Sequence, residues 1–247
     1  MRRFGLIGYP LGHSFSRKYF SEKFAAEGIS DASYDNYPIE KIEFFPSLLI
    51  NTPGITGLNV TIPYKQEVIR YLSEISPEAK DIGAVNVVKV RQGGATKGFN
   101  SDVYGFRESL VPLLQGMDYT ALVLGTGGSS LAVRYVLNEL GIEFMNVSRT
   151  KTGSSLTYEE LTAEIIESHK LIINTTPLGM FPAVAGCPDI DYSRIGKEHI
   201  LYDLVYNPEL TTFLAKGLER GSTVTGGLRM LHLQAERSWQ IWNDPSL

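Results

Sequence analysis

The chain of 247 residues has the composition of an ordinary globular protein, with 43% hydrophobic residues and a net charge of −4. The acidic balance and the lack of a long basic run argue against a nucleic-acid partner. A single cysteine, Cys187, excludes an internal disulfide, and no apolar run approaches the ~20 residues of a membrane span. We therefore expect a soluble, cytoplasmic protein with no membrane partner.

Short apolar runs alternate with helical patterns through the N-terminal part of the chain. Strands are expected over residues 3–7, 33–37, 57–62 and 85–90, and helices over residues 17–27, 42–50 and 64–72. This alternation predicts α/β layering with a mainly parallel sheet, because parallel strands need a crossover connection, which is usually helical.

Lys65 lies at an unusual place in this pattern. In the expected strand before it, apolar residues alternate with Asn59 and Thr61. Pro63 then suits the start of a helix, so Lys65 would lie in a first helical turn, where the helix macrodipole disfavours a cation. Because stability explains such a lysine poorly, we interpret Lys65 as a residue that serves chemistry.

A second α/β series follows the polar turn over residues 98–102. It runs from about residue 119 to residue 226, and a long helix is expected over residues 228–242. The sequence therefore predicts two domains, which comprise residues 1–102 completed by the C-terminal helix of 228–247, and residues 103–227.

The second series opens with a glycine-rich turn between an apolar strand and a helix. Gly125, Gly127 and Gly128 follow the apolar residues 121–124. Such glycines permit a tight turn and a close backbone approach, and the helix N-terminus then faces a pyrophosphate. The order of strand, turn and helix favours a dinucleotide site over an ordinary turn, although Ser130 stands where the fingerprint has Gly or Ala.

The end of the next expected strand, residues 143–147, carries basic side chains where an NAD site normally has an acid. Ser148, Arg149, Thr150 and Lys151 follow that strand. A guanidinium can grip a ribose 2′-phosphate with two parallel hydrogen bonds, so the pattern favours NADP over NAD. A solvated basic loop is the alternative explanation.

These motifs, together with others in the same order, resemble the shikimate dehydrogenase family from Gly8 to Trp242. The segments that carry the resemblance are GYPLGHSFS (8–16), GLNVTIPYK (57–65), GAVN (83–86), GFNSD (98–102), GTGGSS (125–130), SRT (148–150), NTTPLGM (174–180), DLVYNP (203–208), GLRML (227–231) and QA (234–235). The resemblance implies an N-terminal α/β substrate domain, a Rossmann-type NADP-binding domain and a C-terminal helix that returns to the first domain. It also implies reversible, NADP-dependent reduction of 3-dehydroshikimate to shikimate on the route to chorismate and the aromatic amino acids.

The resemblance further implies roles for individual side chains. Lys65 and Asp102 would form the catalytic pair, with Lys65 as the proton donor or acceptor. The implied substrate-binding residues are Ser14 and Ser16, at the carboxylate, and Asn59, Thr61, Asn86, Tyr206 and Gln234. The implied cofactor-binding residues are Gly125, Gly127, Gly128, Ser129, Ser148, Arg149, Thr150, Lys151, Thr176, Gly227 and Met230.

Ordinary structural roles compete with several of these assignments. Ser14 or Ser16 could cap a helix, and so could Asp102. Tyr206 and Met230 could belong to the core. The sequence also departs from the family where Arg17 replaces the usual proline after Ser16, which adds charge beside the expected carboxylate site.

Two other functions stay open. The first is a quinate dehydrogenase that uses NAD, and the second is a non-catalytic, NADP-binding sensor on the same fold. The four histidines show no metal-ligand spacing, so no metal is expected. We expect a monomer or a homodimer.

Overall fold

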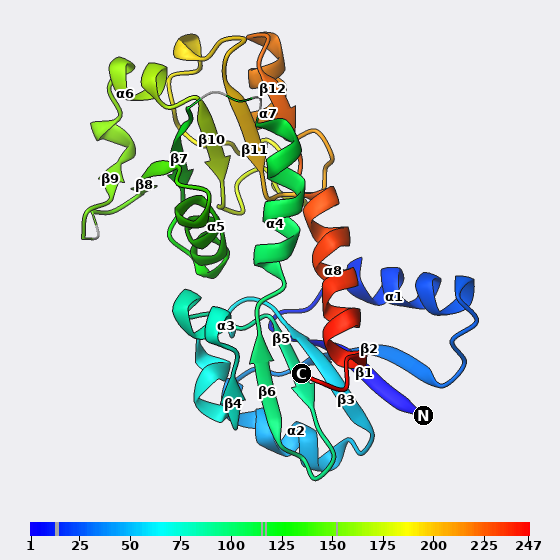
Figure 1. Ribbon diagram of the computed structural model, residues 1–247. Helices are drawn as coiled ribbons and strands as arrows, with labels where there is room; N and C mark the ends of the chain where they lie inside the picture. Colours follow the sequence, from blue (N-terminus) through cyan, green and yellow to red (C-terminus); the bar gives the residue numbers. More distant parts are fainter. Residues whose placement is uncertain (13–14, 115, 117, 152) are drawn as a thin grey trace. The chain divides into compact units, whose positions relative to one another are not determined.

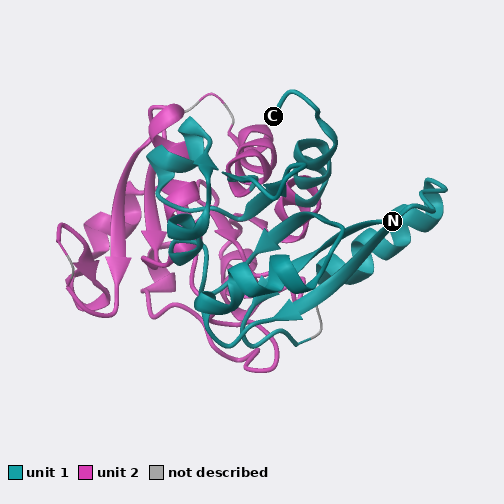
Figure 2. Cartoon of the chain, turned by 90° about the horizontal axis from the view of Figure 1, so that it is seen from below, with its two compact units in different colours: residues 1–101, 235–247 teal, residues 102–234 magenta. Residues whose placement is uncertain are grey.

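The computed structural model describes residues 1–12, 15–114, 116, 118–151 and 153–247. Helices and strands alternate along the chain (Figure 1). They form two compact units, one of residues 1–101 and 235–247 and the other of residues 102–234 (Figure 2). The chain passes from the first unit to the second at Asp102, and it returns inside helix α8, Leu228–Asn243.

The first unit contains a six-stranded sheet in the order β2-β1-β3-β5-β6-β4. The strands are β1 Arg2–Gly8, β2 Ala32–Pro38, β3 Ile55–Val60, β4 Glu74–Ile75, β5 Val87–Val90 and β6 Thr96–Phe99. β1 pairs in parallel with β2 and β3, and β4 pairs in parallel with β6. Among the described strands, only β5 runs antiparallel to both of its neighbours, β3 and β6. The expected mainly parallel α/β sheet is confirmed.

Helices form most of the connections of the first unit, and a turn over residues 91–95 joins β5 to β6. The helices are α1 Phe15–Ala26, the 3₁₀ helix η1 Ile42–Phe44, α2 Phe45–Asn51, the 3₁₀ helix η2 Glu67–Tyr71 and α3 Pro77–Ile82. The C-terminal half of α8 completes the unit. Buried apolar residues gather in two clusters, one around Leu58 and Val60, the other around Phe4 and Trp242.

The helix expected over residues 64–72 is wrong in extent and type. Turns occupy residues 62–66, and only η2 follows. The Lys65 carbonyl accepts a hydrogen bond from the Val85 N–H at 2.7 Å, so it faces a neighbouring segment instead of the next helical turn. Lys65 therefore precedes the helix. The expectation that a helix macrodipole disfavours a lysine at this position is wrong.

The C-terminal helix is fixed to the first sheet by Trp242. A Cβ at Gly57 would lie 2.3 Å from the indole of Trp242, so the ring occupies the space that a side chain at Gly57 would need. The indole N–H donates to the Val88 carbonyl at 3.1 Å. The Lys89 ammonium, which is buried, donates to the Ile241 carbonyl at 3.1 Å and so satisfies an orphan carbonyl at the helix end.

The second unit contains a six-stranded, wholly parallel sheet in the order β12-β11-β10-β7-β8-β9. The strands are β7 Thr120–Leu124, β8 Glu143–Ser148, β9 Leu156–Thr157, β10 Leu171–Asn174, β11 Ile200–Asp203 and β12 Thr223–Thr225. The chain order reverses between β7 and β10, as it does in a Rossmann fold. Ligands of such sheets bind at the carboxyl ends of the strands beside this reversal.

The helices of the second unit connect these parallel strands. They are α4 Asp102–Leu110, η3 Val111–Leu113, α5 Gly128–Glu139, η4 Tyr158–Glu160, α6 Ala163–Ser168, η5 Tyr192–Arg194 and α7 Thr212–Glu219, with the first half of α8. Among the described helices, none combines the length and apolarity that a bilayer crossing requires.

Replacing Gly57 with alanine should destabilise the protein by roughly 1–3 kcal/mol, the usual range for overpacking a filled core. The physical reason is the 2.3 Å approach of the Trp242 ring, which packs on Phe4 at a centroid distance of 4.9 Å and cannot withdraw freely. Chemical denaturation gives the free energy of unfolding. Gly196→Ala is the matched control, because a Cβ there meets no atom within 4 Å and the glycine needs no positive φ. Equal stabilities of the two variants would contradict the packing argument.

Candidate active site

The glycine turn after β7 needs a glycine at Gly125 and leaves open space beside Gly127. Gly125 has a φ of +108°, and a Cβ there would lie 2.6 Å from the Thr175 hydroxyl oxygen. Gly127 precedes α5 as its N-cap, and an added Cβ would meet no atom within 4 Å. The backbone of the turn is therefore open to an incoming group at the N-terminus of a 12-residue helix. This cradle fits the pyrophosphate of a dinucleotide.

The basic loop lies at the end of β8, the strand beside β7. Ser148 is buried and its hydroxyl donates to the Thr150 carbonyl, so it shapes the turn. Lys151 pairs with Glu160, and this hydrogen bond lowers the pKa of the Glu160 carboxyl. Arg149 is exposed, and within the described part of the chain no carboxylate lies at ion-pair distance from it. Arg149 is thus the cation of this loop that can meet a phosphate.

A buried polar network lies at the ends of β10 and β11, on the side of β7 opposite β8. Asn174, at the end of β10, donates to the Asp203 carboxylate at 2.9 Å and accepts from the Thr176 hydroxyl at 2.6 Å. Asp203, at the end of β11, also accepts from the Thr211 hydroxyl at 2.6 Å and from the Val205 N–H at 3.0 Å. Burial raises the pKa of Asp203 to about 6.

This network holds the loops that follow β10 and β11, a role that sequence reasoning missed. Both strand ends belong to segments that resemble the family, yet the sequence alone assigned no function to Asn174, Asp203 or Thr211. The available signal is a polar residue at the end of each apolar strand, Leu171–Asn174 and Ile200–Asp203.

The start of α8 packs closely on the loop after β11. A Cβ at Gly227 would lie 2.2 Å from the Leu204 carbonyl oxygen, and the Gly227 N–H donates to the Val205 carbonyl at 3.0 Å. Met230 is buried, which agrees with core packing. Gln234 is also buried, and its amide donates to the Leu231 carbonyl at 2.9 Å.

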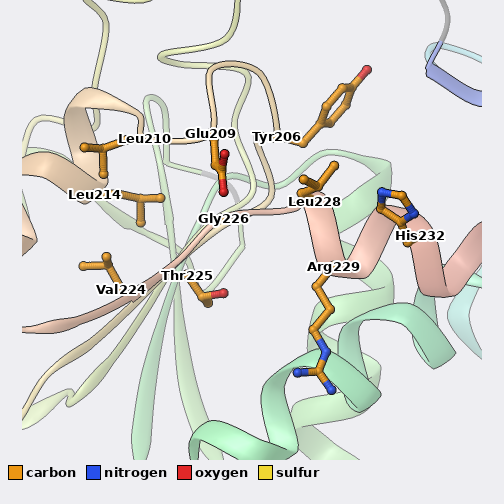
Figure 3. A pocket seen from close by; sticks show the side chains of 10 residues that line it. All are labelled: Tyr206, Glu209, Leu210, Leu214, Val224, Thr225, Gly226, Leu228, Arg229 and His232. Atoms are coloured by element: carbon orange, nitrogen blue, oxygen red, sulfur yellow. The ribbon is translucent and has the colours of Figure 1, made fainter.

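A cavity of about 740 Å³ lies between the loop after β11 and the start of α8 (Figure 3). Its lining residues are Tyr206, Glu209, Leu210, Leu214, Val224, Thr225, Gly226, Leu228, Arg229 and His232. The Tyr206 ring points away from Glu209, as Figure 3 shows. Burial raises the pKa of Tyr206.

In the first unit, several predicted substrate residues belong to one buried polar network. The Tyr34 hydroxyl donates to the Asn59 side-chain oxygen at 2.9 Å, and it is also hydrogen-bonded to Ser16. The Asn59 amide donates to the Asn86 carbonyl at 3.3 Å and to the Ser238 hydroxyl at 2.9 Å. The structure thus brings Ser16, Asn59 and Asn86 together, with Tyr34 and Ser238 as members that the sequence had not indicated.

Asn86 is held on its other side by Ser101. The Ser101 N–H donates to the Asn86 side-chain oxygen at 2.7 Å, and the Asn86 amide donates to the Ser101 hydroxyl at 3.1 Å. Among the described residues, nothing accepts the second amide hydrogen of Asn86. Asn59 differs, because both of its amide hydrogens are used inside the protein.

The remaining predicted residues lie around this network or outside it. Thr61 follows β3, and its N–H donates to the Ile7 carbonyl at 2.9 Å. Lys65 is half-buried in the first unit, whereas Asp102 is buried as the first residue of α4 in the second. Their pairing therefore stays a prediction. Ser14 lies outside the described residues.

The described residues offer no candidate metal centre. Their histidine, cysteine, aspartate and glutamate side chains form no group of three that could hold a metal ion. The geometry of the two units instead presents a dinucleotide cradle and a cluster of hydroxyl and amide groups.

Comparisons with known proteins agree with these features. The model of the shikimate dehydrogenase substrate binding domain matches residues 6–88. The NADP(+) shikimate dehydrogenase of Clostridium beijerinckii is 40% identical over 260 residues, which cover 100% of this chain and 94% of that protein.

Solved structures give the same result. Shikimate 5-dehydrogenase of Thermus thermophilus, in complex with NADP(H) and shikimate, superposes with a TM-score of 0.87 at 30% identity, covering 100% of this chain and 96% of the other. Quinate dehydrogenase of Corynebacterium glutamicum, in complex with NAD, gives a TM-score of 0.86 at 26% identity, with 98% and 93% covered. The similarity extends over nearly the whole chain, and the protein belongs to the shikimate dehydrogenase family.

Proposed function

We propose that this protein is an NADP-dependent shikimate dehydrogenase, which reversibly reduces the ring ketone of 3-dehydroshikimate to shikimate. The observation that carries the proposal is the full-length similarity to NADP(+) shikimate dehydrogenases, at 40% identity for the Clostridium beijerinckii protein. The open glycine turn, the exposed Arg149 and the buried hydroxyl and amide network agree with it. Its place is the biosynthesis of chorismate and the aromatic amino acids in the cytoplasm.

The second unit supplies the residues that would hold NADP. The turn from Gly125 to Ser129 would receive the pyrophosphate, and Arg149 the 2′-phosphate. Thr176 comes from the loop that the Asn174–Asp203 network holds, Gly227 directly precedes α8, and Met230 lies in the first turn of α8. When bound, the nicotinamide ring supplies or accepts the hydride of the reaction.

Lys65 and Asp102 would manage the proton. During reduction, the Lys65 ammonium donates a proton to the carbonyl oxygen as negative charge develops on it, and during oxidation the amine accepts the proton from the hydroxyl. Asp102 would orient the lysine and accept a hydrogen bond from the same substrate hydroxyl. This division of roles makes Lys65 the catalytic acid or base and Asp102 its partner.

The first unit would bind the substrate, in agreement with the substrate-domain match over residues 6–88. Shikimate carries several hydroxyls and a carboxylate, and each of these groups must find a partner when it leaves water. Asn86 can offer an amide hydrogen, while Ser14 and Ser16 would hold the carboxylate. Asn59 has both amide hydrogens committed within the protein, so we assign it to positioning.

The second candidate function is quinate oxidation with NAD, which the similarity to the Corynebacterium glutamicum quinate dehydrogenase raises. The basic loop at Arg149, which lacks an acid at the end of β8, favours NADP. A non-catalytic sensor is disfavoured because it would need neither Lys65 nor Asp102.

Steady-state assays with four combinations of substrate and cofactor test the proposal. We expect the highest kcat/KM for shikimate with NADP, compared with shikimate and NAD, quinate and NADP, and quinate and NAD. A preference for quinate with NAD would support the second candidate. Cofactor binding without turnover of either substrate would support the sensor.

Replacing Lys65 should lower kcat by about 10²–10⁴-fold, the usual contribution of general acid–base catalysis, with a smaller change in KM for shikimate. Lys65→Met keeps much of the bulk and removes the charge, and Lys65→Ala removes both. Lys80→Met, at an exposed lysine of α3, is the control and should keep the wild-type kcat. A kcat near that of the wild type in both Lys65 variants would remove this residue from the catalytic role.

Replacing Arg149 with alanine should weaken the binding of NADP much more than that of NAD, because only NADP carries the 2′-phosphate. Titration of each cofactor gives the two dissociation constants. Arg220→Ala, at an exposed arginine at the end of α7, should change neither. Equal losses for the two cofactors in Arg149→Ala would show that this loop does not read the phosphate.

A further inference from the structure

Asn86, the proposed substrate amide of the first unit, and its neighbour Asn59 share hydrogen-bond partners with a serine near the C-terminal end of the chain. Ser238 lies on α8 and is fully buried, as is Ser101. The Ser238 hydroxyl accepts from the Asn59 amide at 2.9 Å and lies 3.1 Å from the Ser101 hydroxyl. Ser101 in turn contacts Asn86. One hydroxyl therefore connects the side-chain hydrogen bonds of Asn59, on β3, with those of Asn86, which directly precedes β5.

The hydrogen-bond partners fix which way each amide faces. A backbone carbonyl only accepts, so the Asn59 nitrogen must face the Asn86 carbonyl, and its oxygen then faces Tyr34. A backbone N–H only donates, so the Asn86 oxygen must face the Ser101 N–H. The second amide hydrogen of Asn86 is then the group left for a ligand.

The position of Ser238 is itself fixed by packing. On the same buried face of α8 lie Ala235, Ile241 and Trp242, and Trp242 fills the space above Gly57. Ser238 is a polar residue on this face, and a buried hydroxyl is unfavourable unless it is hydrogen-bonded. Its presence among apolar neighbours agrees with a role in holding the amides.

We propose that Ser238 is a positioning residue for substrate recognition, which acts through Asn59 and Ser101 on Asn86 and on the backbone that leads into Asp102. The proposal rests on the proposed function, since it assigns a role at the same substrate site. It makes the C-terminal helix a part of the substrate-binding apparatus through a side chain that does not touch the ligand.

Ser238→Ala tests the proposal, because it should change the KM for the substrate but not the KM for the cofactor. Loss of the hydroxyl leaves one Asn59 amide hydrogen unpaired and lets the Ser101 hydroxyl shift. We expect the KM for shikimate to rise by about tenfold, the scale of one repositioned hydrogen bond, while the KM for NADP stays within about twofold. The dissociation constant of shikimate, measured by calorimetric titration, should rise in parallel.

Ser109→Ala is the matched control. Ser109 is a buried helical serine of the second unit, and its hydroxyl lies 2.6 Å from the Tyr202 hydroxyl. Its loss should lower the thermal midpoint as the loss of any buried hydrogen bond does, but leave the KM for shikimate within about twofold. If the role of Ser238 were purely structural, both variants would have a lower thermal midpoint and a nearly unchanged KM for shikimate.

Ser238→Cys decides the question if Ser238→Ala does not fold. It keeps the shape of the side chain, while a thiol is only a weak acceptor for the Asn59 amide and a weak donor to the Ser101 hydroxyl. The same selective rise in the KM for shikimate is expected. An unchanged KM for shikimate, or equal rises for shikimate and NADP, would overturn the inference while the proposed function stands. A wild-type protein that neither binds nor oxidises shikimate would overturn both.

Discussion

Polar side chains stand at the ends of buried strands in both units, and burial obliges them to bond one another. In the second unit, Asp203 is fully buried and accepts from three donors, one of them the Asn174 amide. In the first unit, Asn59 and Asn86 lie between Tyr34 and two serines. A buried donor or acceptor left unpaired would destabilise the fold by about 1–3 kcal/mol. The side chains that would contact ligands are therefore held in place by neighbouring side chains that would not contact them.

The two networks hold different parts of the chain. The Asn174–Asp203 network holds the backbone of the loops after β10 and β11, because Asn174 accepts from the Thr176 N–H and Asp203 from the Val205 N–H. In the network around Asn86, one amide hydrogen of that residue has no acceptor among the described residues. A site that recognises hydroxyls by such groups can discriminate strongly, because a wrong substrate leaves a buried group without its partner.

The chain crosses between its two units at positions that matter for the proposed chemistry. The crossings lie at Ser101–Asp102 and at Gln234–Ala235. Asp102 and Gln234 both belong to the predicted site, and each begins or ends the segment that forms the second unit. The backbone that carries these residues is thus anchored in the first unit by its immediate neighbours, Ser101 in the polar network and Ala235 in the core.

The sequence by itself determined the layered α/β organisation, the glycine turn and the basic loop. Each of these depends on neighbouring residues, either through the periodicity of apolar side chains or through the residue types that stand at one turn. It also placed the long C-terminal helix, which the structure has as Leu228–Asn243. Tertiary contacts decided the rest. The Val85 N–H donates to the Lys65 carbonyl, where the sequence had predicted a helical turn. The side chains that bond Asn59 and Asn86 reach them only when β2, β3, β5, β6 and α8 pack together; they are Tyr34, Ser101 and Ser238. Sequence spacing cannot show hydrogen bonds between residues so far apart in the chain, since they exist only once the core has brought those elements into contact.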